Sequence, residues 1–189
     1  LLAAGPGALL GGWLARASIS PLCPPLRGAR RPDLEHERIR TLLHAVEPRV
    51  VIAVDEVLSA FGENSGAATA IPWLSESEVI EASSSGRAFD SKPQPDDIGL
   101  IQFSSGSTGI PKGIVLRHRQ IRANVDGIGR RVAVTREDSM VSWLPLHHDM
   151  GLIGFHLTPL FQGVDHWLMP TALFVRRPAL WMAKAAEHR

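Results

Sequence analysis

Hydrophobic positions alternate along the chain between short continuous runs and longer stretches with helical spacing. In residues 33–46, apolar side chains recur every three or four positions, between Pro32 and Pro48. This spacing predicts a helix with a proline start signal and a proline stop signal. Residues 49–54 are rich in valine and predict a buried strand. Such alternation is typical of an α/β domain in which sheets and helices form layers.

The remaining elements follow the same pattern, with one long interruption. Residues 59–94 are dominated by glycine, serine, alanine and glutamate, which predicts mostly loop, with a short strand or helix near Val79 and Ile80. The apolar segment 1–14 reaches Arg16 too early to span a bilayer, so we expect a helix of the core. Helices are also expected over 117–131, over 152–161 and from 177 onward, and strands over 98–103, 114–116, 140–143 and 164–169.

Composition narrows the classes of protein that fit. Apolar residues make up 44% of the 189 residues and charged residues 21%, which excludes a disordered or collagen-like chain. Twenty basic and nineteen acidic residues leave a net charge of +1, so the overall charge attracts neither nucleic acid nor anionic lipid. Cys23 is the single cysteine in the sequence, which excludes a disulfide framework and a cysteine-based zinc site and favours a reducing, cytoplasmic setting.

One segment has the composition of a phosphate-binding loop. Residues 104–113, SSGSTGIPKG, contain four hydroxyl side chains, three glycines and one lysine between two predicted strands. Glycine lets backbone N–H groups approach a ligand closely, so consecutive amides can form an anion-binding concavity. Ser105, Ser107 and Thr108 would add hydroxyl donors, and Lys112 would add a positive charge.

The loop has two alternative interpretations. The Walker pattern requires serine or threonine directly after the lysine, and Gly113 stands there instead, which disfavours a standard P-loop. A flexible glycine and serine connector is the structural alternative. The segment lies between two predicted buried strands and ends in Pro-Lys-Gly, and both features favour a ligand-binding loop over a connector.

Two motifs resemble those of one superfamily of enzymes. Residues 96–118, DDIGLIQFSSGSTGIPKGIVLRH, resemble the phosphate loop of the adenylate-forming enzymes, which include acyl-CoA synthetases, fatty acyl-AMP ligases, amino-acid adenylation domains and luciferases. Residues 142–154, SWLPLHHDMGLIG, are similar to the motif beside the acyl pocket of the same enzymes. With PLCPPLRG near Pro21 and FVRRPALW near Phe174, the form of this motif is most similar to the fatty acyl-AMP ligase branch.

The resemblance implies an α/β fold and a two-step reaction. A fatty acid carboxylate would attack the α-phosphate of ATP to give acyl-AMP and pyrophosphate, and a thiol of an acyl carrier protein or of CoA would then accept the acyl group. The chain would be part of the large N-terminal AMP-binding domain. The remainder of that domain, which binds Mg²⁺, and a small C-terminal domain would lie outside it. The chain begins without methionine and stops at Arg189 within a helical pattern, so we expect a fragment that is inactive alone.

Site residues follow from the resemblance, position by position. His148 and Lys112 are the expected catalytic residues, with His148 near the reacting carboxylate. The leaving phosphates would be held by Ser105, Gly106, Ser107, Thr108, Gly109 and Lys112, and the acyl pocket would be lined by Trp143, His148, Met150 and Gly151.

Three positions depart from the pattern of the family. His147 stands where acyl-AMP ligases often have tyrosine, and Asp165 and His166 stand where apolar or small residues are usual. These differences concern substrate preference more than the class of reaction. Three alternatives stay open: a fatty acyl-CoA synthetase, an amino-acid adenylation domain, or a truncated relative that binds nucleotide without catalysis. The second is disfavoured because no acidic residue is evident that would pair with a substrate amine.

Other interpretations of individual side chains are disfavoured. The histidines from 147 to 166 lack a metal-binding spacing such as His-Glu-x-x-His, so we expect no metal, with His148 packed or lining a pocket and His147 at the surface. The arginines from 117 to 136 have no stacking aromatic residues among them and predict a solvent-exposed helix face instead of a nucleic-acid surface. Core or core-edge positions are expected for Trp13, Trp73, Trp143, Trp167 and Trp181.

Overall fold

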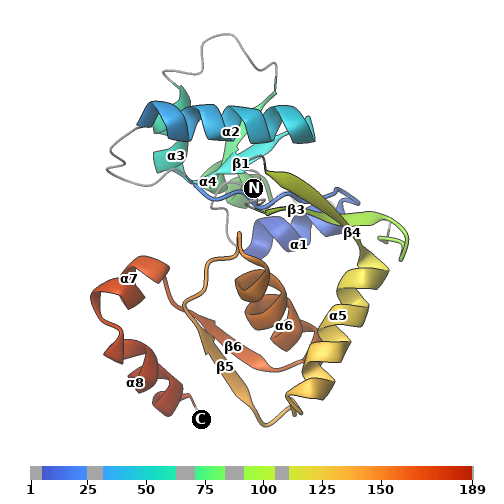
Figure 1. Ribbon diagram of the computed structural model, residues 1–189, viewed down its shortest axis with the longest axis vertical. Helices are drawn as coiled ribbons and strands as arrows, with labels where there is room; N and C mark the ends of the chain where they lie inside the picture. Colours follow the sequence, from blue (N-terminus) through green and yellow to red (C-terminus); the bar gives the residue numbers. More distant parts are fainter. Residues whose placement is uncertain (1–5, 25–31, 63–70, 84–91, 105–110, 189) are drawn as a thin grey trace. The chain divides into compact units, whose positions relative to one another are not determined.

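Helices and short strands alternate along the chain, as the hydrophobic pattern predicts. The computed structural model describes residues 6–24, 32–62, 71–83, 92–104 and 111–188. The chain divides into two compact units, residues 1–116 and residues 117–189 (Figure 1). Among the described residues, no helix is both long enough and apolar enough to cross a lipid bilayer.

The described residues of the first unit form four helices and four strands. In chain order these are α1 (Pro6–Leu14), α2 (Pro32–Val46), β1 (Val51–Ala53), α3 (Asp55–Gly62), β2 (Trp73–Ser75), α4 (Glu76–Ser83), β3 (Ile98–Ser104) and β4 (Lys112–Arg117). β1 pairs with β2 in parallel, and β3 pairs with β4.

The core of the first unit lies between α2 and β1. α2 begins after the predicted proline and carries Asp33 and Glu35 in its first turn, where carboxylates interact favourably with the helix dipole. Its residues Ile39, Leu42 and Leu43 are buried, and Trp73 and Phe103 pack against the cluster that they join. The buried cluster consists of Leu22, Ile39, Leu42, Leu43, Val51, Ala53 and Val57.

β3 is fixed by the segment that contains α1 and the residues after it. The indole Nε1 of Trp13 donates to the carbonyl of Gly99 at 2.7 Å. Ile19 pairs with Leu100 in the manner of a parallel strand. A salt bridge of 3.0 Å between Arg16 and Asp97 adds to these contacts. β3, the strand that leads into the predicted phosphate loop, is therefore held at its N-terminal end by backbone and side-chain bonds.

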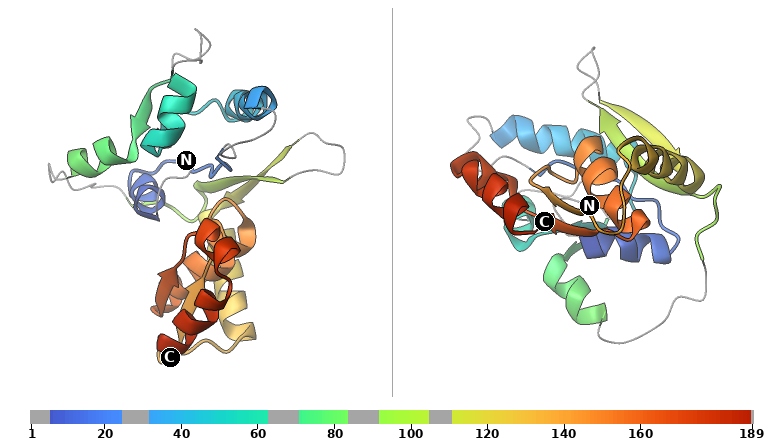
Figure 2. Two further views of the ribbon diagram at one scale, coloured as in Figure 1. Left: turned by 90° about the vertical axis from the view of Figure 1, so that its left-hand side faces the viewer. Right: turned by 90° about the horizontal axis from the view of Figure 1, so that it is seen from below.

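The second unit has a two-stranded parallel sheet with helices around it (Figure 2). Its elements are α5 (His118–Arg131), β5 (Ser139–Ser142), the π-helix η1 (Met150–Leu157), α6 (Thr158–Gln162), β6 (Asp165–Leu168), α7 (Thr171–Arg176) and α8 (Ala179–Glu187). β5 and β6 pair in register from Ser139 opposite Asp165 to Ser142 opposite Leu168. α5 packs against η1 and α6 through Ile121, Val125 and Gly129.

Aromatic side chains attach the last two helices to β5. The ring of Trp143 stacks on Phe174 of α7 with centroids 3.8 Å apart, and Phe174 meets Trp181 of α8 edge to face. The indole Nε1 of Trp181 donates to the carbonyl of Val141 at 2.8 Å. Trp167 differs from the predicted core position, because it is exposed and stacks on His188.

Over 59–94 the predicted short helix near Val79 and Ile80 is confirmed, whereas the predicted loop is wrong for much of the rest of the described part. The end of α3, β2 and α4 lie there, and α4 contains Val79 and Ile80. A capping signal was present in the sequence: Ser75 Oγ accepts from the N–H of Glu78, and the Glu78 carboxylate accepts from the N–H of Ser75. The backbone N–H of Ser75, and to a lesser extent its side chain, lower the pKa of the Glu78 carboxyl by hydrogen bonding to it.

Smaller differences concern the ends of elements and one helix. β1 is shorter than the predicted 49–54, because only its central residues reach the core while Arg49 and Val50 stay exposed. α7 was not predicted, and it has no buried residue that would have produced a helical pattern. The expected helix over 152–161 consists of η1 followed by α6.

Two leucines on α2 test the position of this core. Leu42 is 4% exposed and Leu34 is 55% exposed. We expect Leu42→Ala to lower the free energy of unfolding by about 2–5 kcal/mol, because it removes buried methyl groups and leaves a cavity. Leu34→Ala makes the same chemical change on the solvent side, and we expect a change within about 0.5 kcal/mol. Urea denaturation measures both, and equal losses would contradict the assigned core.

Candidate functional site

The predicted phosphate loop joins two paired strands. Residues 105–110, and with them the predicted ligands Ser105, Gly106, Ser107, Thr108 and Gly109, lie outside the described residues. On one side of the loop, β3 ends at Ser104 after the buried positions Leu100 and Gln102. On the other side, Lys112 is the first residue of β4, and its side chain is exposed. An exposed lysine at a strand end can reach an anionic ligand without loss of an internal partner.

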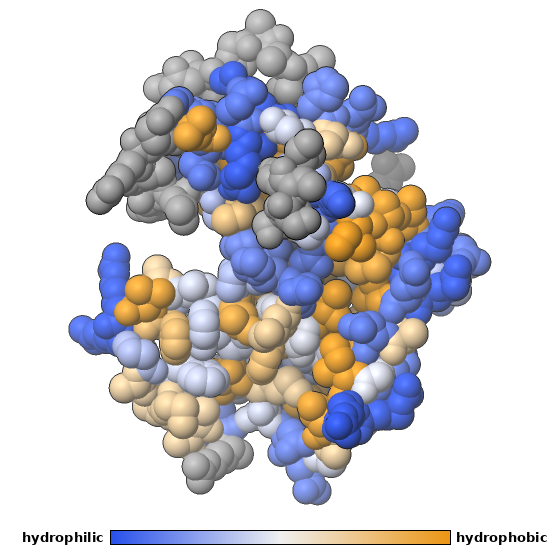
Figure 3. Space-filling view, in the orientation of Figure 1, coloured by the Kyte–Doolittle hydropathy of each residue, from blue (hydrophilic) through white to orange (hydrophobic). Residues whose placement is uncertain are grey.

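β4 is much more exposed than a buried strand. Ile114 and Val115 are both about half exposed, and Figure 3 shows hydrophobic side chains gathered over the part of the first unit where β3 and β4 lie. Gly113 faces β3, where an added Cβ would be 3.4 Å from the ring of Phe103. A side chain at position 113 would therefore lie in ordinary van der Waals contact with β3.

The second motif forms a tight turn between β5 and η1. The N–H of His148 donates to the carbonyl of Pro145 at 3.2 Å, and the N–H of Leu152 donates to the carbonyl of His148 at 2.8 Å. The carboxylate of Asp149 accepts from the N–H of Met150 at 2.7 Å and caps the start of η1. Trp143, at the end of β5, is half-buried and stacked on Phe174.

The burial of the two motif histidines is the reverse of the prediction. His148 is exposed and His147 is half-buried. Their ring centroids are 4.9 Å apart with the planes tilted by 43°, so the two rings lie near each other and do not point to opposite sides. The reason is the turn itself, in which consecutive side chains do not alternate as they do along a strand. Met150 is exposed beside His148, so these two predicted pocket residues are accessible in the second unit.

Gly151 has a packing role that the sequence did not reveal. It is buried, and an added Cβ would overlap the carbonyl oxygen of Pro145 and would lie 3.0 Å from its carbonyl carbon. Only glycine lets the first turn of η1 approach the Leu144–Pro145 backbone this closely. Gly151 therefore shapes the turn that presents His148 and Met150.

η1 carries a buried polar residue that the sequence did not identify as part of a site. His156 is 2% exposed, and its Nδ1 lies 2.9 Å from Nε2 of His166 on β6. Burial, and to a lesser extent the neighbouring His166, lower the pKa of His156 to about 4. Burial also lowers the pKa of His166, against the opposing effect of Asp165. In the sequence, both histidines stand out only as disfavoured metal ligands, and His166 also as a departure from the family pattern.

Other candidate sites are less well supported by the described residues. No group of three histidine, cysteine, aspartate or glutamate side chains in the described part of the chain is arranged to hold a metal ion. The prediction of a solvent-exposed arginine face is confirmed, because all six arginines between 117 and 136 are exposed.

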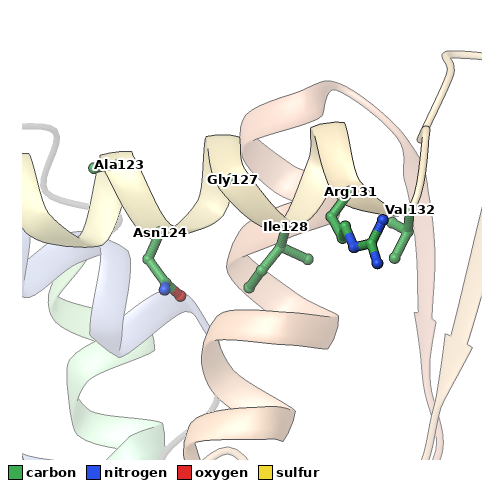
Figure 4. Close-up of a pocket in the computed structure, with 6 residues that line it drawn as sticks. All are labelled: Ala123, Asn124, Gly127, Ile128, Arg131 and Val132. Atoms are coloured by element: carbon green, nitrogen blue, oxygen red, sulfur yellow. The ribbon is translucent and has the colours of Figure 1, made fainter.

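A groove on α5 is lined by residues of neither motif. Figure 4 shows its lining side chains, which all come from α5 and the residue after it: Ala123, Asn124, Gly127, Ile128, Arg131 and Val132. The groove lies on one helix and offers a single charged side chain, so it does not combine the donors that a nucleotide polyphosphate requires.

Comparison with known proteins identifies the family. The sequence model of the AMP-binding enzyme family matches residues 7–189. The chain belongs to this family. A medium-chain fatty acid–[acyl-carrier-protein] ligase of Teredinibacter turnerae is 35% identical over 128 residues, which cover 68% of this chain and 20% of the relative. A protein of Caulobacter vibrioides, provisionally named acyl-CoA synthetase, is 51% identical over 89 residues, which cover 47% of this chain and 16% of the relative.

Solved structures of AMP-binding enzymes support the same assignment. The crystal structure of fatty acyl-adenylate ligase from Legionella pneumophila, in complex with acyl adenylate and pyrophosphate, matches with a TM-score of 0.80 and 28% identity. The match covers 97% of this chain and 32% of the ligase. The predicted α/β fold of an adenylate-forming enzyme is therefore confirmed. The chain spans between 16% and 32% of the length of these three proteins.

Two glycines of η1 test the close approach at the second motif. We expect Gly151→Ala to lower the free energy of unfolding by about 1–3 kcal/mol, because the new methyl group would overlap the Pro145 carbonyl. Gly154→Ala is the matched control, since its Cβ would be 3.9 Å from Met150 Cγ and alanine favours a helix. Thermal denaturation compares the two, and an unchanged midpoint for Gly151→Ala would contradict the packing role.

Proposed function

We propose that the protein containing this chain activates a fatty acid carboxylate with ATP, as a member of the AMP-binding enzymes. The observation that carries the proposal is the turn at the second motif, where Gly151 packs against Pro145 and leaves His148 and Met150 accessible. This motif is the part of the sequence that most resembles fatty acyl-AMP ligases, and two of the similar proteins described above are named as fatty acid ligases.

In the proposed first step, a carboxylate oxygen of the fatty acid attacks the α-phosphorus of ATP. The bond from the α-phosphorus to the bridging oxygen breaks, and pyrophosphate leaves with the electron pair. The protein would contribute position and charge more than covalent chemistry. Lys112 and the amides of residues 105–109 would offset the charge of the leaving phosphates, and His148 would orient the carboxylate at the entrance of the acyl pocket.

The acceptor step and the metal extend beyond this chain. A thiol of an acyl carrier protein would attack the acyl carbonyl of acyl-AMP, form the thioester and release AMP. The described residues contain no cluster of three potential metal ligands, so we assign no step to Mg²⁺ within them. We propose that the chain is part of an N-terminal AMP-binding domain and that the remaining ligands lie elsewhere in the protein.

A fatty acyl-CoA synthetase is the second candidate function. The observation in its favour is the 51% identity to the Caulobacter vibrioides protein, which is higher than the identity to the carrier-protein ligase but extends over a shorter segment. The two functions share the first step and differ only in the thiol that accepts the acyl group.

The products of the complete protein distinguish these functions. The test combines ATP, Mg²⁺ and a twelve-carbon fatty acid, with and without CoA, and identifies products by mass spectrometry. We expect acyl-AMP and pyrophosphate, with acyl-AMP persisting when CoA is present. Conversion to acyl-CoA would instead establish the second candidate, and release of ADP or absence of any adenylate would refute the proposed activity.

Two exposed lysines of the first unit test the phosphate contact. We expect Lys112→Ala to lower kcat/KM for ATP roughly 10- to 100-fold, because it removes a charge-assisted bond worth about 1.5–3 kcal/mol. Lys92→Ala removes the same charge from another exposed position of the first unit and should leave kcat/KM nearly unchanged. Pyrophosphate release measures both rates, and equal effects would argue against a local contact at Lys112.

A further inference from the structure

A hydrogen-bonded pair of histidines links two elements inside the second unit. Nδ1 of His156 and Nε2 of His166 lie 2.9 Å apart, with ring centroids separated by 4.9 Å. His156 belongs to η1, the helix that begins at Met150 of the second motif, and His166 belongs to β6. The pair therefore joins the helix that presents the motif to the strand that pairs with β5.

The surroundings of His156 accommodate only its neutral form. Its ring is 2% exposed, and its Nε2 atom is buried without a hydrogen-bond partner among the described residues. In the neutral pair, one ring donates to the other through the 2.9 Å contact. A second proton on His156 would leave an N–H group buried without an acceptor and would place a positive charge in the interior, and both are costly.

The backbone around His156 adds to this constraint. η1 has the wide turns of a π-helix, which are rare and are frequent at functional sites. The turn that ends η1 is held by Thr158, whose backbone N–H and hydroxyl both donate to the carbonyl of Ile153. In the described part of the chain, a side-chain hydrogen bond from His156 to His166 connects η1 with β6. Loss of this bond would therefore remove this link between η1 and β6, while the packing of η1 on β5, α5 and α6 remains.

Few charged groups of the neighbouring elements act on the pair. α6 and β5, which pack against η1, contain no titratable side chain. β6 contributes Asp165, which favours a charged His166, and His188 stacks on the next residue of that strand. α5 also packs against η1, and Arg122 of α5 is paired with Asp126 at 2.8 Å. The other titratable residues of α5 are His118, Arg119, Arg130 and Arg131.

We propose that the His156–His166 pair is an acid-sensitive link that positions the second motif by holding η1 against β6 near neutral pH and releasing it on acidification. His156 and His166 are positioning residues, since they act through η1. The existence of the link does not depend on the proposed function. Only its effect on acyl activation rests on that function.

The direction of the pH effect follows from proton uptake. We call the state in which the histidine pair holds η1 against β6 the closed form, and the state in which the pair is broken and solvated the open form. In the closed form the pKa of His156 is lowered to about 4, whereas an exposed histidine has the ordinary value of 6.5. As the pH falls from 6.5 toward 4, the open form binds a proton that the closed form excludes. Acid therefore favours the open form progressively over this range, and the closed form is fully favoured above it.

Hydrogen exchange of the complete protein tests the link without substrate. Mass spectrometry follows deuterium uptake by peptides that cover residues 150–162, at pH 7.5 and pH 5.0, with rates corrected for the intrinsic pH dependence of exchange. We expect corrected exchange in the unmodified protein to be about tenfold faster at pH 5.0. In His156→Gln, whose amide can still donate to His166 but cannot be protonated, we expect a much smaller ratio, because only His166 can still take up a proton.

Two further variants separate titration from loss of packing. The double variant His156→Leu, His166→Val replaces the pair by apolar side chains. Because neither position can then take up a proton, the acid ratio of this variant should be near one. His44→Gln changes an exposed histidine of α2 and should keep the tenfold ratio. An equal acid ratio in the unmodified protein and in His156→Gln would overturn the proposal, as would a ratio near one in the unmodified protein.

Activity measurements connect the link to the proposed reaction. If the protein forms acyl-AMP, the rate should fall more steeply between pH 7.5 and pH 5.0 in the unmodified protein than in His156→Gln. A parallel pH dependence in the two proteins would overturn the positioning role. If no adenylate forms at any pH, the proposed function fails, and hydrogen exchange still decides whether the link exists.

Discussion

The contact between Gly151 and the carbonyl of Pro145 determines how the chain leaves β5. A strand that ends in a proline-containing segment cannot continue its ladder, and the chain must turn before η1 begins. The missing Cβ at Gly151 lets the first turn of η1 lie directly on the Leu144–Pro145 backbone. His148 and Met150 are exposed because the residues on either side of them are fixed by this contact. The accessible part of the motif thus depends on the packing of its buried part.

Strong periodicity and local signals explain which elements could be predicted. α2 and α5 have long amphipathic patterns, and their observed ends lie within a residue or two of the predicted ones. α4 is only eight residues long, and its exposed glutamates weaken the pattern, but the reciprocal bonds of Ser75 and Glu78 are a capping box that the sequence contained. α7 gave no such signal, because its side chains do not enter a core.

The arrangement of the site was less predictable than its residues. The motif at residues 142–154 can be recognised from its amino-acid sequence. The reversed burial of His147 and His148, however, depends on turn geometry that no periodic pattern encodes. The π-helix is likewise invisible in the sequence, since it has the same apolar composition as an α-helix. His156 and His166 are ten positions apart, and only the packing of η1 on β6 makes them partners. A side chain that departs from a family pattern, His166, can thus find its partner on another element.

The distribution of charge indicates how a polyphosphate would be held. Residues 1–116, which include the predicted phosphate loop, carry ten basic and thirteen acidic side chains, whereas residues 117–189 carry ten basic and six acidic ones. The unit that contains the loop therefore has a net negative charge, which repels ATP at long range. Screening at physiological salt confines such repulsion to about 8 Å, so short-range donors decide binding. Backbone amides of a glycine-rich loop and one lysine at a strand end are donors of this kind, and they act only on a phosphate already in place. Such a site would select its ligand by geometry at contact, as the proposed alignment of the α-phosphorus with a carboxylate requires.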